Sequence, residues 1–367
     1  MTRYFRGSFL VTAAGLLLAA ALGWRTTGTA SGTMTVVFIV AVLAVLEVSL
    51  SFDNAVVNAA VLQHMDAVWR QRFITWGIPI AVFGMRIVFP LLIVAVTAQI
   101  SPWSALVLAG TDPDGYSRAL TSAHVSVSAF GGTFLAMVGL KHFLDHEKEV
   151  HWIRAIEEPL ARLGRIEAVE LALVLLLLWI VSRWLPMLEE RLEFLIAGIT
   201  GLVTYIVVDG VAALLAPDGA AGGAGRSGLG GFLYLQVLDA SFSFDGVIGA
   251  FALSNNLFVI AIGLGIGAMF VRSLTLLLVE RGTLTEYRYL EHGAFWAILC
   301  LAAIMFLETV RHVPEGVTGL IGAAFLGVAF WSSLRHNREV APAHADTTPS
   351  PKSGPGERAQ TGTGPDV

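Results

Sequence analysis

Two stretches of this chain repeat an unusual pattern of acidic and hydroxyl residues inside apolar sequence. Residues 47–54 read Glu-Val-Ser-Leu-Ser-Phe-Asp-Asn, and residues 239–246 read Asp-Ala-Ser-Phe-Ser-Phe-Asp-Gly. Each copy places two carboxylates within an apolar segment long enough to cross a bilayer, where a charge costs several kcal/mol. Acids kept at such a cost in a duplicated pattern indicate a functional site.

The first copy forms a line of oxygen atoms if it is helical. At about 100° per residue, four side chains fall on one narrow face: Glu47, Ser51, Asn54 and Asn58. Asp53 points away from this face. Glu47 and Asp53 can therefore meet on one ion only if the helix kinks or unwinds near residues 49–51, which serine side chains assist.

Carboxylate, amide and hydroxyl oxygens are ligands that suit hard cations such as Mg²⁺, Ca²⁺ and Mn²⁺. Four acids in a low-dielectric site must bind a divalent ion, share protons or pair with the two arginines that follow the motifs. Metal-for-proton exchange is one hypothesis from this competition, and static ion pairs without transport are the alternative. The predicted metal ligands are Glu47, Asp53, Asn54, Asp239 and Asp245, with Ser51 and Ser243 as auxiliary ligands and Arg86 and Arg272 as counter-charges.

The composition is that of a polytopic membrane protein. Mean hydropathy is +0.72, and 14% of the residues are charged, whereas soluble domains have about 25%. The single cysteine, Cys300, excludes a disulfide framework and a cysteine metal cluster. The helices contain no nucleophile elbow, phosphate loop or zinc-type histidine spacing. We therefore expect that the protein is not an enzyme and has no permanently bound cofactor and no nucleic-acid partner. The oligomeric state does not follow from the sequence.

Apolar segments of about 20 residues predict membrane-spanning helices. Basic residues concentrate in the loops on the side of the N-terminus, which predicts a multi-pass protein of the cell membrane with both termini in the cytoplasm. Residues 1–24 are expected to be an uncleaved first helix, with a signal peptide as the alternative. Ten segments qualify, at 8–24, 34–62, 73–98, 121–143, 167–185, 193–215, 230–254, 257–279, 291–311 and 316–334.

The two motifs fall on the second and seventh of these helices, so they cross the membrane in opposite directions. The helix after each motif carries an arginine, Arg86 or Arg272. Two inverted three-helix repeats are the usual architecture of secondary transporters. The expected fold is all-α, with the divisions 1–33 (N-terminal helix), 34–145 (first repeat), 146–229 (connection), 230–311 (second repeat), 312–336 (last helix) and 337–367 (disordered cytoplasmic tail).

The connection begins with a charged cytoplasmic loop at 145–166, in which an amphipathic helix is expected. Three histidines in or beside it, His142, His146 and His151, are expected to be solvated. Asp209 is interpreted as a helix-end residue, with a proton-relay acid as the alternative. A glycine-rich linker follows at 219–231.

The paired motifs resemble those of the TerC family, which was first named for tellurium resistance and is related to the LysE-type exporters. The likeness rests on residues 47–54 and 239–246 and extends less specifically over 34–145 and 230–310. It implies a transporter with two inverted three-helix halves and, for several relatives, manganese export with the motif acids as the metal site. The extra N-terminal span, the extra helix pair and the glycine-rich linker depart from the family pattern.

The leading hypothesis is an exporter of a divalent cation, Mn²⁺ above all, driven by protons or the membrane potential. An exporter of small organic cations or amino acids is the second hypothesis, and it would need a chamber of several hundred Å³. A non-transporting membrane scaffold linked to tellurite or metal-stress resistance is the third, with the loop at 145–166 as its docking surface.

Overall fold

The computed structural model describes residues 2–63, 65–146, 148, 150–214, 228–311, 313 and 315–345, and the regular secondary structure of this part is helical. The prediction of an all-helical protein is confirmed for these residues, among which no strand occurs. Some side chains inside the described helices, that of Asp245 included, lie outside the description. Most of the expected glycine-rich linker and of the C-terminal tail also falls outside the described residues.

The first half of the chain contains α1 to α8, with one segment of π-helix, η1, that continues directly from α4 into α5. These elements are α1 (Thr2–Thr27), α2 (Ala30–Leu50), α3 (Phe52–Leu62), α4 (Ala67–Pro79), η1 (Ile80–Val88), α5 (Phe89–Thr97), α6 (Pro102–Thr111), α7 (Pro113–Ser122) and α8 (His124–Phe143). The remaining helices are α9 (Arg154–Leu163), α10 (Val169–Ser182), α11 (Leu188–Leu214), α12 (Gly228–Leu253), α13 (Leu257–Glu280), α14 (Thr283–Glu286), α15 (Leu290–Glu308) and α16 (Glu315–Ala345).

Several helices begin where the sequence supplies an acceptor for their first backbone N–H groups. Asp66 accepts a hydrogen bond from the backbone of α4, and Asn256 accepts two from the first turn of α13. Ser101 and Asp112 begin α6 and α7 in the same way, each followed by a proline, whose fixed φ suits the first helical position.

Within the described residues, six helices are long and apolar enough to cross a membrane, and α7 with α8 forms a seventh candidate that is bent by 50°. This is consistent with a multi-pass membrane protein. The shorter α10, together with α12 and α16, is helical but is not among these candidates, so the count of ten spans stays a prediction. The six are Tyr4–Thr27, Ala30–Leu50, Ile80–Thr97, Leu188–Val211, Leu257–Glu280 and Leu290–Glu308.

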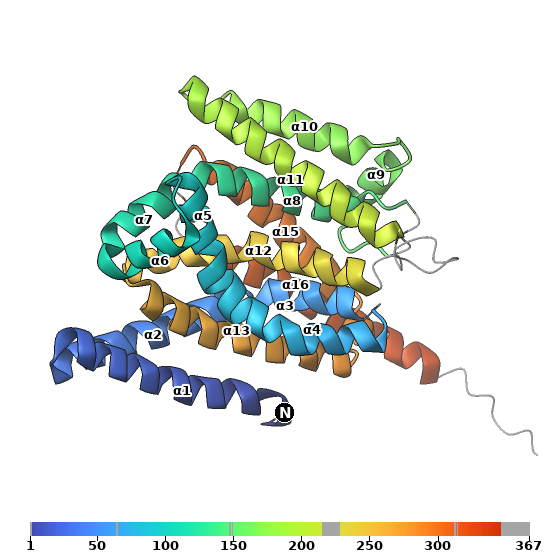
Figure 1. The fold of residues 1–367 in the computed structure, drawn as a ribbon. Coiled ribbons are helices and arrows are strands. Elements are labelled where there is room, and N and C mark those ends of the chain that lie inside the picture. The colour runs from blue at the N-terminus through green and yellow to red at the C-terminus, as the bar shows by residue number, and fades with distance from the viewer. Residues whose placement is uncertain are drawn as a thin grey trace, which may run out of the picture.

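The helices are stacked in layers, with α12 running through the middle (Figure 1). The hairpin of α10 and α11 covers α8 at one side, and α1 packs on α2 and α13 at the opposite side. The helices that carry the two motifs exchange partners. The first-motif helix α3 contacts α13 and α15, and the second-motif helix α12 contacts η1 and α8, so each motif packs against helices that follow the other motif.

Two glycines on α13 allow that helix to approach α2 closely. A Cβ atom at Gly263 would lie 2.6 Å from Leu43 Cβ, and one at Gly267 would lie 2.5 Å from Glu47 Cβ. Small residues four positions apart are a common contact between membrane helices. The backbone that carries Glu47 is therefore held directly against α13.

The last helix departs from the expected division of the chain. The tail was expected to begin at residue 337, but α16 continues to Ala345. Asn337 is tied down, because its side-chain amide donates a hydrogen bond to the backbone carbonyl of Glu286 at 2.9 Å. Residues 346–367 lie outside the described residues.

Candidate functional site

The first motif contains a break between two helices at Ser51. Its backbone has φ −104° and ψ 17°, outside the α-helical range, so α2 ends at Leu50 and α3 begins at Phe52. The Ser51 hydroxyl donates to Glu47 Oε1 at 2.9 Å. Helix geometry predicted that Glu47 and Asp53 could face one ion only if the helix broke near residues 49–51. The structure contains a break at this place. The second motif has no equivalent, because α12 runs without interruption past residues 239–246.

Glu47 is buried and forms an ion pair with Arg86, which is buried as well. The same guanidinium group donates a hydrogen bond to the Ser243 hydroxyl of the second motif. Arg86 therefore connects the two motifs. It lies on η1, whose π-helical pattern includes a hydrogen bond from the N–H of Phe89 to the carbonyl of Gly84, and segments of this type occur often at functional sites.

Asp239 interacts with polar side chains of α3, the helix that follows the break in the first motif. Its Oδ1 accepts a hydrogen bond from the Asn58 side-chain amide at 2.8 Å, and Asn54, Arg86 and Arg272 also act on it electrostatically. The second motif thus places an acid against polar groups of the first half of the chain, whereas Glu47 pairs with Arg86 of its own half.

Arg272 differs from Arg86 in its contacts. It donates a hydrogen bond to the backbone carbonyl of Phe73 at 2.7 Å and lies over the Phe73 ring, 5.5 Å from its centroid. Among the described residues no carboxylate lies within ion-pair distance of it. Of the two predicted counter-charges, Arg86 is the one that forms an ion pair with a motif acid.

Asp53 is 7% exposed and accepts a hydrogen bond from the backbone N–H of Asn54. Within the described part of the chain it forms no ion pair. Gly322 of α16 allows the close approach of that helix, because a Cβ atom there would lie 3.2 Å from Asp53 Oδ2. A carboxylate buried without a counter-charge is costly unless it is protonated or a cation lies nearby.

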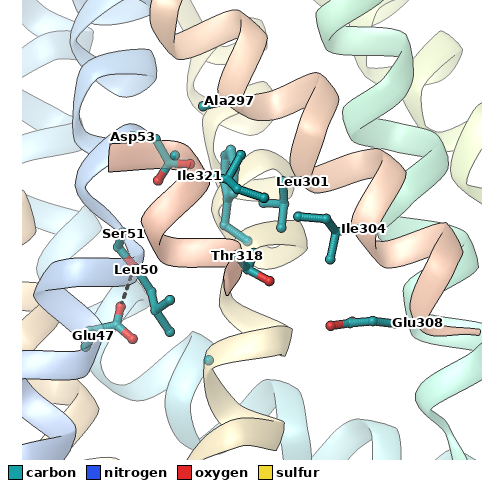
Figure 2. A pocket seen from close by; sticks show the side chains of 13 residues that line it. Glu47, Leu50, Ser51, Asp53, Ala297, Leu301, Ile304, Glu308, Thr318 and Ile321 are labelled. Carbon is teal, nitrogen blue, oxygen red and sulfur yellow. Dashed lines mark hydrogen bonds between the residues drawn. The ribbon is translucent and has the colours of Figure 1, made fainter. Parts of the chain in front are cut away.

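A small cavity opens beside the helix break (Figure 2). It has a volume of about 40 Å³ and lies between α2, α3, α12, α15 and α16. Three carboxylates line it, those of Glu47, Asp53 and Glu308, together with the hydroxyl-bearing residues Ser51 and Thr318. In Figure 2, Asp53 and Glu47 extend from one wall, and Glu308 stands at the far side.

Glu308 was not singled out in the sequence. It is a lone acid at the end of an apolar helix, outside both motifs, and its pattern alone gives no signal. In the structure its side chain is 10% exposed and its Oε2 lies 3.7 Å from Nε2 of His124.

The predicted ligands do not converge on one point. Glu47 is paired with Arg86, Asp239 with Asn58, and Asp53 faces the cavity. The described residues contain no group of three or more His, Cys, Asp or Glu side chains placed to hold a metal ion, and the side chain of Asp245 lies outside the description. Ser51 and Ser243 serve in this arrangement as hydrogen-bond partners of Glu47 and Arg86.

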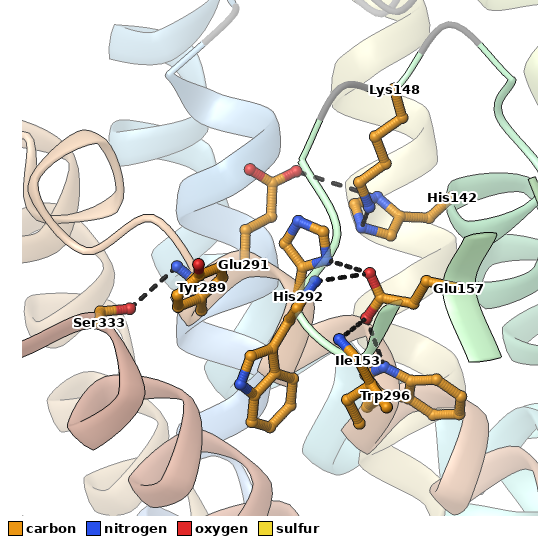
Figure 3. A network of polar contacts seen from close by, with 10 residues as sticks. His142, Lys148, Ile153, Glu157, Tyr289, Glu291, His292, Trp296 and Ser333 are labelled. Atoms are coloured by element: carbon orange, nitrogen blue, oxygen red, sulfur yellow. Dashed lines mark hydrogen bonds and ion pairs between the residues drawn. The ribbon is translucent and has the colours of Figure 1, made fainter. Parts of the chain in front are cut away.

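A second polar network joins the charged loop to α15 (Figure 3). The amphipathic helix expected in this loop is present as α9, and Glu157 on it is only 1% exposed. Its carboxylate accepts hydrogen bonds from the backbone N–H groups of Trp152 and Ile153 and from the Trp296 indole, and it pairs with His292 Nδ1 at 3.0 Å. Burial alone would raise the pKa of Glu157, but these partners hold it at about 2.

The expectation that the loop histidines are solvated is correct for His146 alone, which is exposed. The His142 ring stacks on Phe295 at 3.6 Å between centroids, because the loop packs against α15. His151 is partly buried, and its Nε2 has no hydrogen-bond partner among the described residues.

Asp209 forms an ion pair with Lys141 at 2.5 Å.

The sequence of the chain matches the profile of one known protein family. Residues 52–340 match the sequence profile of a family described as "Protein of unknown function (DUF475)". No curated protein and no solved structure matches the chain. The matched range contains Asp53, the whole second motif and Glu308, and begins just after Glu47. Since it covers well over half of the sequence, the chain belongs to the DUF475 family.

Proposed function

We propose that this protein is a membrane transporter that exports a hard divalent cation, with Mn²⁺ as the first candidate, as the resemblance to TerC proteins implies. The cation is bound by oxygen atoms around the helix break, and export is driven by protons or the membrane potential. The proposed ligands are those expected from the sequence: Glu47, Asp53, Asn54, Asp239 and Asp245.

The observation that carries this proposal is a surplus of buried oxygen acceptors around α3. Asp53 is buried without an ion pair within the described residues. Asn54 and Asn58 are each nine-tenths or more buried, and their Oδ1 atoms have no hydrogen-bond partner among the described residues. Buried acceptors are normally satisfied, and a bound ion is one way to satisfy them. A cation surrounded by carboxylate and amide oxygens supplies the missing partner.

The ion pair between Glu47 and Arg86 fits a transport cycle in which a cation competes with an arginine. Arg86 neutralises Glu47 when no cargo is bound, and it also binds Ser243. A cation that draws Glu47 away from Arg86 would loosen the connection between the motifs. The two halves can then move relative to each other, as alternating access requires.

The size of the cavity favours an ion over an organic molecule. About 40 Å³ is room for a few water molecules, whereas sites for organic ligands usually have about 300–1,000 Å³. This weighs against the hypothesis of an exporter for organic cations or amino acids.

The exchange of helix partners supports the proposed inverted repeat. Each motif helix contacts the arginine-bearing element and the third helix of the other half. This reciprocity is expected when two similar three-helix units face each other around one site.

The charged loop weighs against the scaffold hypothesis. Glu157 and His142 are packed against α15 of the same chain. These side chains are therefore not free to form a docking surface for another protein.

The test is the metal content of manganese-stressed cells that express wild-type protein, the double variant Asp53→Asn and Asp245→Asn, or the control Glu189→Gln. Glu189 is an exposed acid at the start of α11. Wild type and the control should lower cellular manganese, and the double variant should not. Magnesium, calcium, zinc and iron are measured in the same samples to define the cargo. If all three proteins reach the membrane and no metal changes in any strain, the proposal is wrong.

A further inference from the structure

We propose that Glu308 and His124 form the pair that carries the exchanged proton. This inference rests on the proposed export function and names the proton site within it. The pair lies outside both acidic motifs, on helices that come third in each expected repeat.

The geometry places Glu308 at the cavity, with His124 next to it and the motif acids on the other side. Glu308 ends α15 and lines the cavity from the side opposite Glu47 and Asp53 (Figure 2). His124 begins α8, directly after the 50° bend between α7 and α8. The two side chains are 3.7 Å apart, and Ser128 Oγ lies 3.5 Å from the same His124 nitrogen.

The helix ends make a charged pair less favourable than it would be elsewhere. The carboxyl end of a helix carries a partial negative charge, and its amino end carries a partial positive charge. Glu308 puts a carboxylate at the carboxyl end of α15, and the dipole of that helix opposes its negative charge. His124 begins α8 only two residues after Ser122 ends α7, so the carboxyl end of α7 offsets the amino end of α8 there. The state with Glu⁻ beside His⁺ therefore gains less over the neutral state, and this pair is where we place the exchanged proton.

The other charges around Glu308 link this proton to the cargo. Of the helices packed on α15, α8 contributes His124, α3 contributes Asp53 across the cavity, and α16 contributes the uncharged Thr318. Glu47 of α2 lines the same cavity, and Arg311 beyond the helix end is exposed. A divalent cation near Asp53 repels a proton on the pair, and loss of that proton leaves a negative charge that attracts the cation.

The exchange step involves one proton and no change of oxidation state. Uptake forms an N–H bond at His124 or an O–H bond at Glu308, and release to water on the other side breaks the same bond. Histidine is the side chain whose ordinary titration spans the pH range in which cells operate. The cation crosses in the direction opposite to the proton, as export driven by protons requires.

The experiment measures Mn²⁺ flux in liposomes that contain the full-length protein, with an entrapped Mn²⁺-sensitive dye and a pH-sensitive dye. Four proteins are compared: wild type, Glu308→Gln, His124→Gln and the control Glu193→Gln. Glu193 is an exposed acid on α11 that binds Ser126 of the same α8, outside the cavity. Two modes are recorded: Mn²⁺ movement driven by a pH gradient, and exchange of Mn²⁺ for Mn²⁺ without a gradient.

Wild type and Glu193→Gln should show both modes. Glu308→Gln should lose the pH-driven mode and the coupled proton movement but keep Mn²⁺ exchange, because the motif acids are intact. His124→Gln should show the same loss. This second variant still tests the inference if Glu308→Gln fails to fold. Glu308→Gln with an unchanged pH-driven flux, or with loss of both modes in a folded protein, would overturn the inference. Absence of Mn²⁺ movement in wild type would instead refute the proposed export function itself.

Discussion

Replacing Glu157 by alanine should release α9 and the charged loop from α15. In the folded protein its two carboxylate oxygens accept from the Trp152 and Ile153 backbones, from Trp296 and from His292. Without the carboxylate these donors stay buried and lose their acceptor. A buried donor without a partner costs much more than an exposed one, which binds water instead.

The size of the loss follows from the donors left without an acceptor and from the pKa of Glu157. A buried donor without its partner typically costs about 1–3 kcal/mol, and more when charge is involved. A pKa that falls on folding from the ordinary 4.5 to about 2 corresponds to about 3 kcal/mol. Because the folded value is the lower one, this stabilisation is present above about pH 4.5 and is lost as the pH falls toward 2. At neutral pH the loss for Glu157→Ala should therefore be about 3 kcal/mol.

Hydrogen–deuterium exchange in detergent micelles at neutral pH measures this loss locally. A cost of about 3 kcal/mol should raise exchange in residues 152–163 and at the start of α15 by about 100-fold. Glu158→Gln is the matched control, because the Glu158 side chain is 52% exposed and its one ion pair within the described residues is with Arg162 on the surface. Such a contact is worth at most about 1 kcal/mol. If Glu157→Ala exchanges like Glu158→Gln, the network does not hold the loop, and the reasoning from burial is wrong.

Three further predictions follow from the packing and the charges. Gly267→Leu should prevent α13 from packing on α2, because a Cβ atom there already lies 2.5 Å from that of Glu47; it should lower the melting temperature, whereas Gly327→Ala, which meets nothing within 4 Å, should not. Arg86→Met should destabilise the fold by about 3–5 kcal/mol by leaving Glu47 unpaired, and adding Glu47→Met should restore most of the melting temperature; no recovery would contradict the pairing. Burial lowers the pKa of Lys148 to about 8 although nearby carboxylates raise it, so holding its charge costs stability at neutral pH. Relative to Lys148→Met, wild type should therefore gain stability as the pH rises from about 8 toward 10.5, and parallel melting curves would refute this.

The helical fold, the acids within apolar helices and the break in the first motif could be predicted from the sequence. Long apolar segments in a chain with few charges admit helices, because every backbone polar group must be satisfied inside a membrane. The need for a break near Ser51 followed from helix geometry alone, since six residues do not bring Glu47 and Asp53 to one face. Both conclusions depend only on hydropathy and helix periodicity over short stretches of the chain, so they need no knowledge of tertiary contacts.

The partners of the acids could not be predicted, because they come from distant parts of the chain. Arg86 was one of two candidates for Glu47, and only the packing of η1 against α12 and α13 selects it and adds Ser243. The histidines in or beside the charged loop were expected to be solvated, yet His142 stacks on Phe295. Glu157 of the same loop is buried where His292 and Trp296 meet it. A charged residue can be buried wherever the fold supplies enough donors, and composition does not show where that happens.

The sequence by itself determined that this chain is helical, apolar enough for a membrane and marked by two acidic motifs, because composition, periodicity and repeats are properties of the chain order. Only the tertiary structure decided that a cavity forms at the break and that Glu308 lines it beside His124. These two residues come from helices far apart in the sequence and carry no shared pattern. Their proximity results from how α8 and α15 pack together, since the geometry of a site is set by contacts between elements and not by the elements alone.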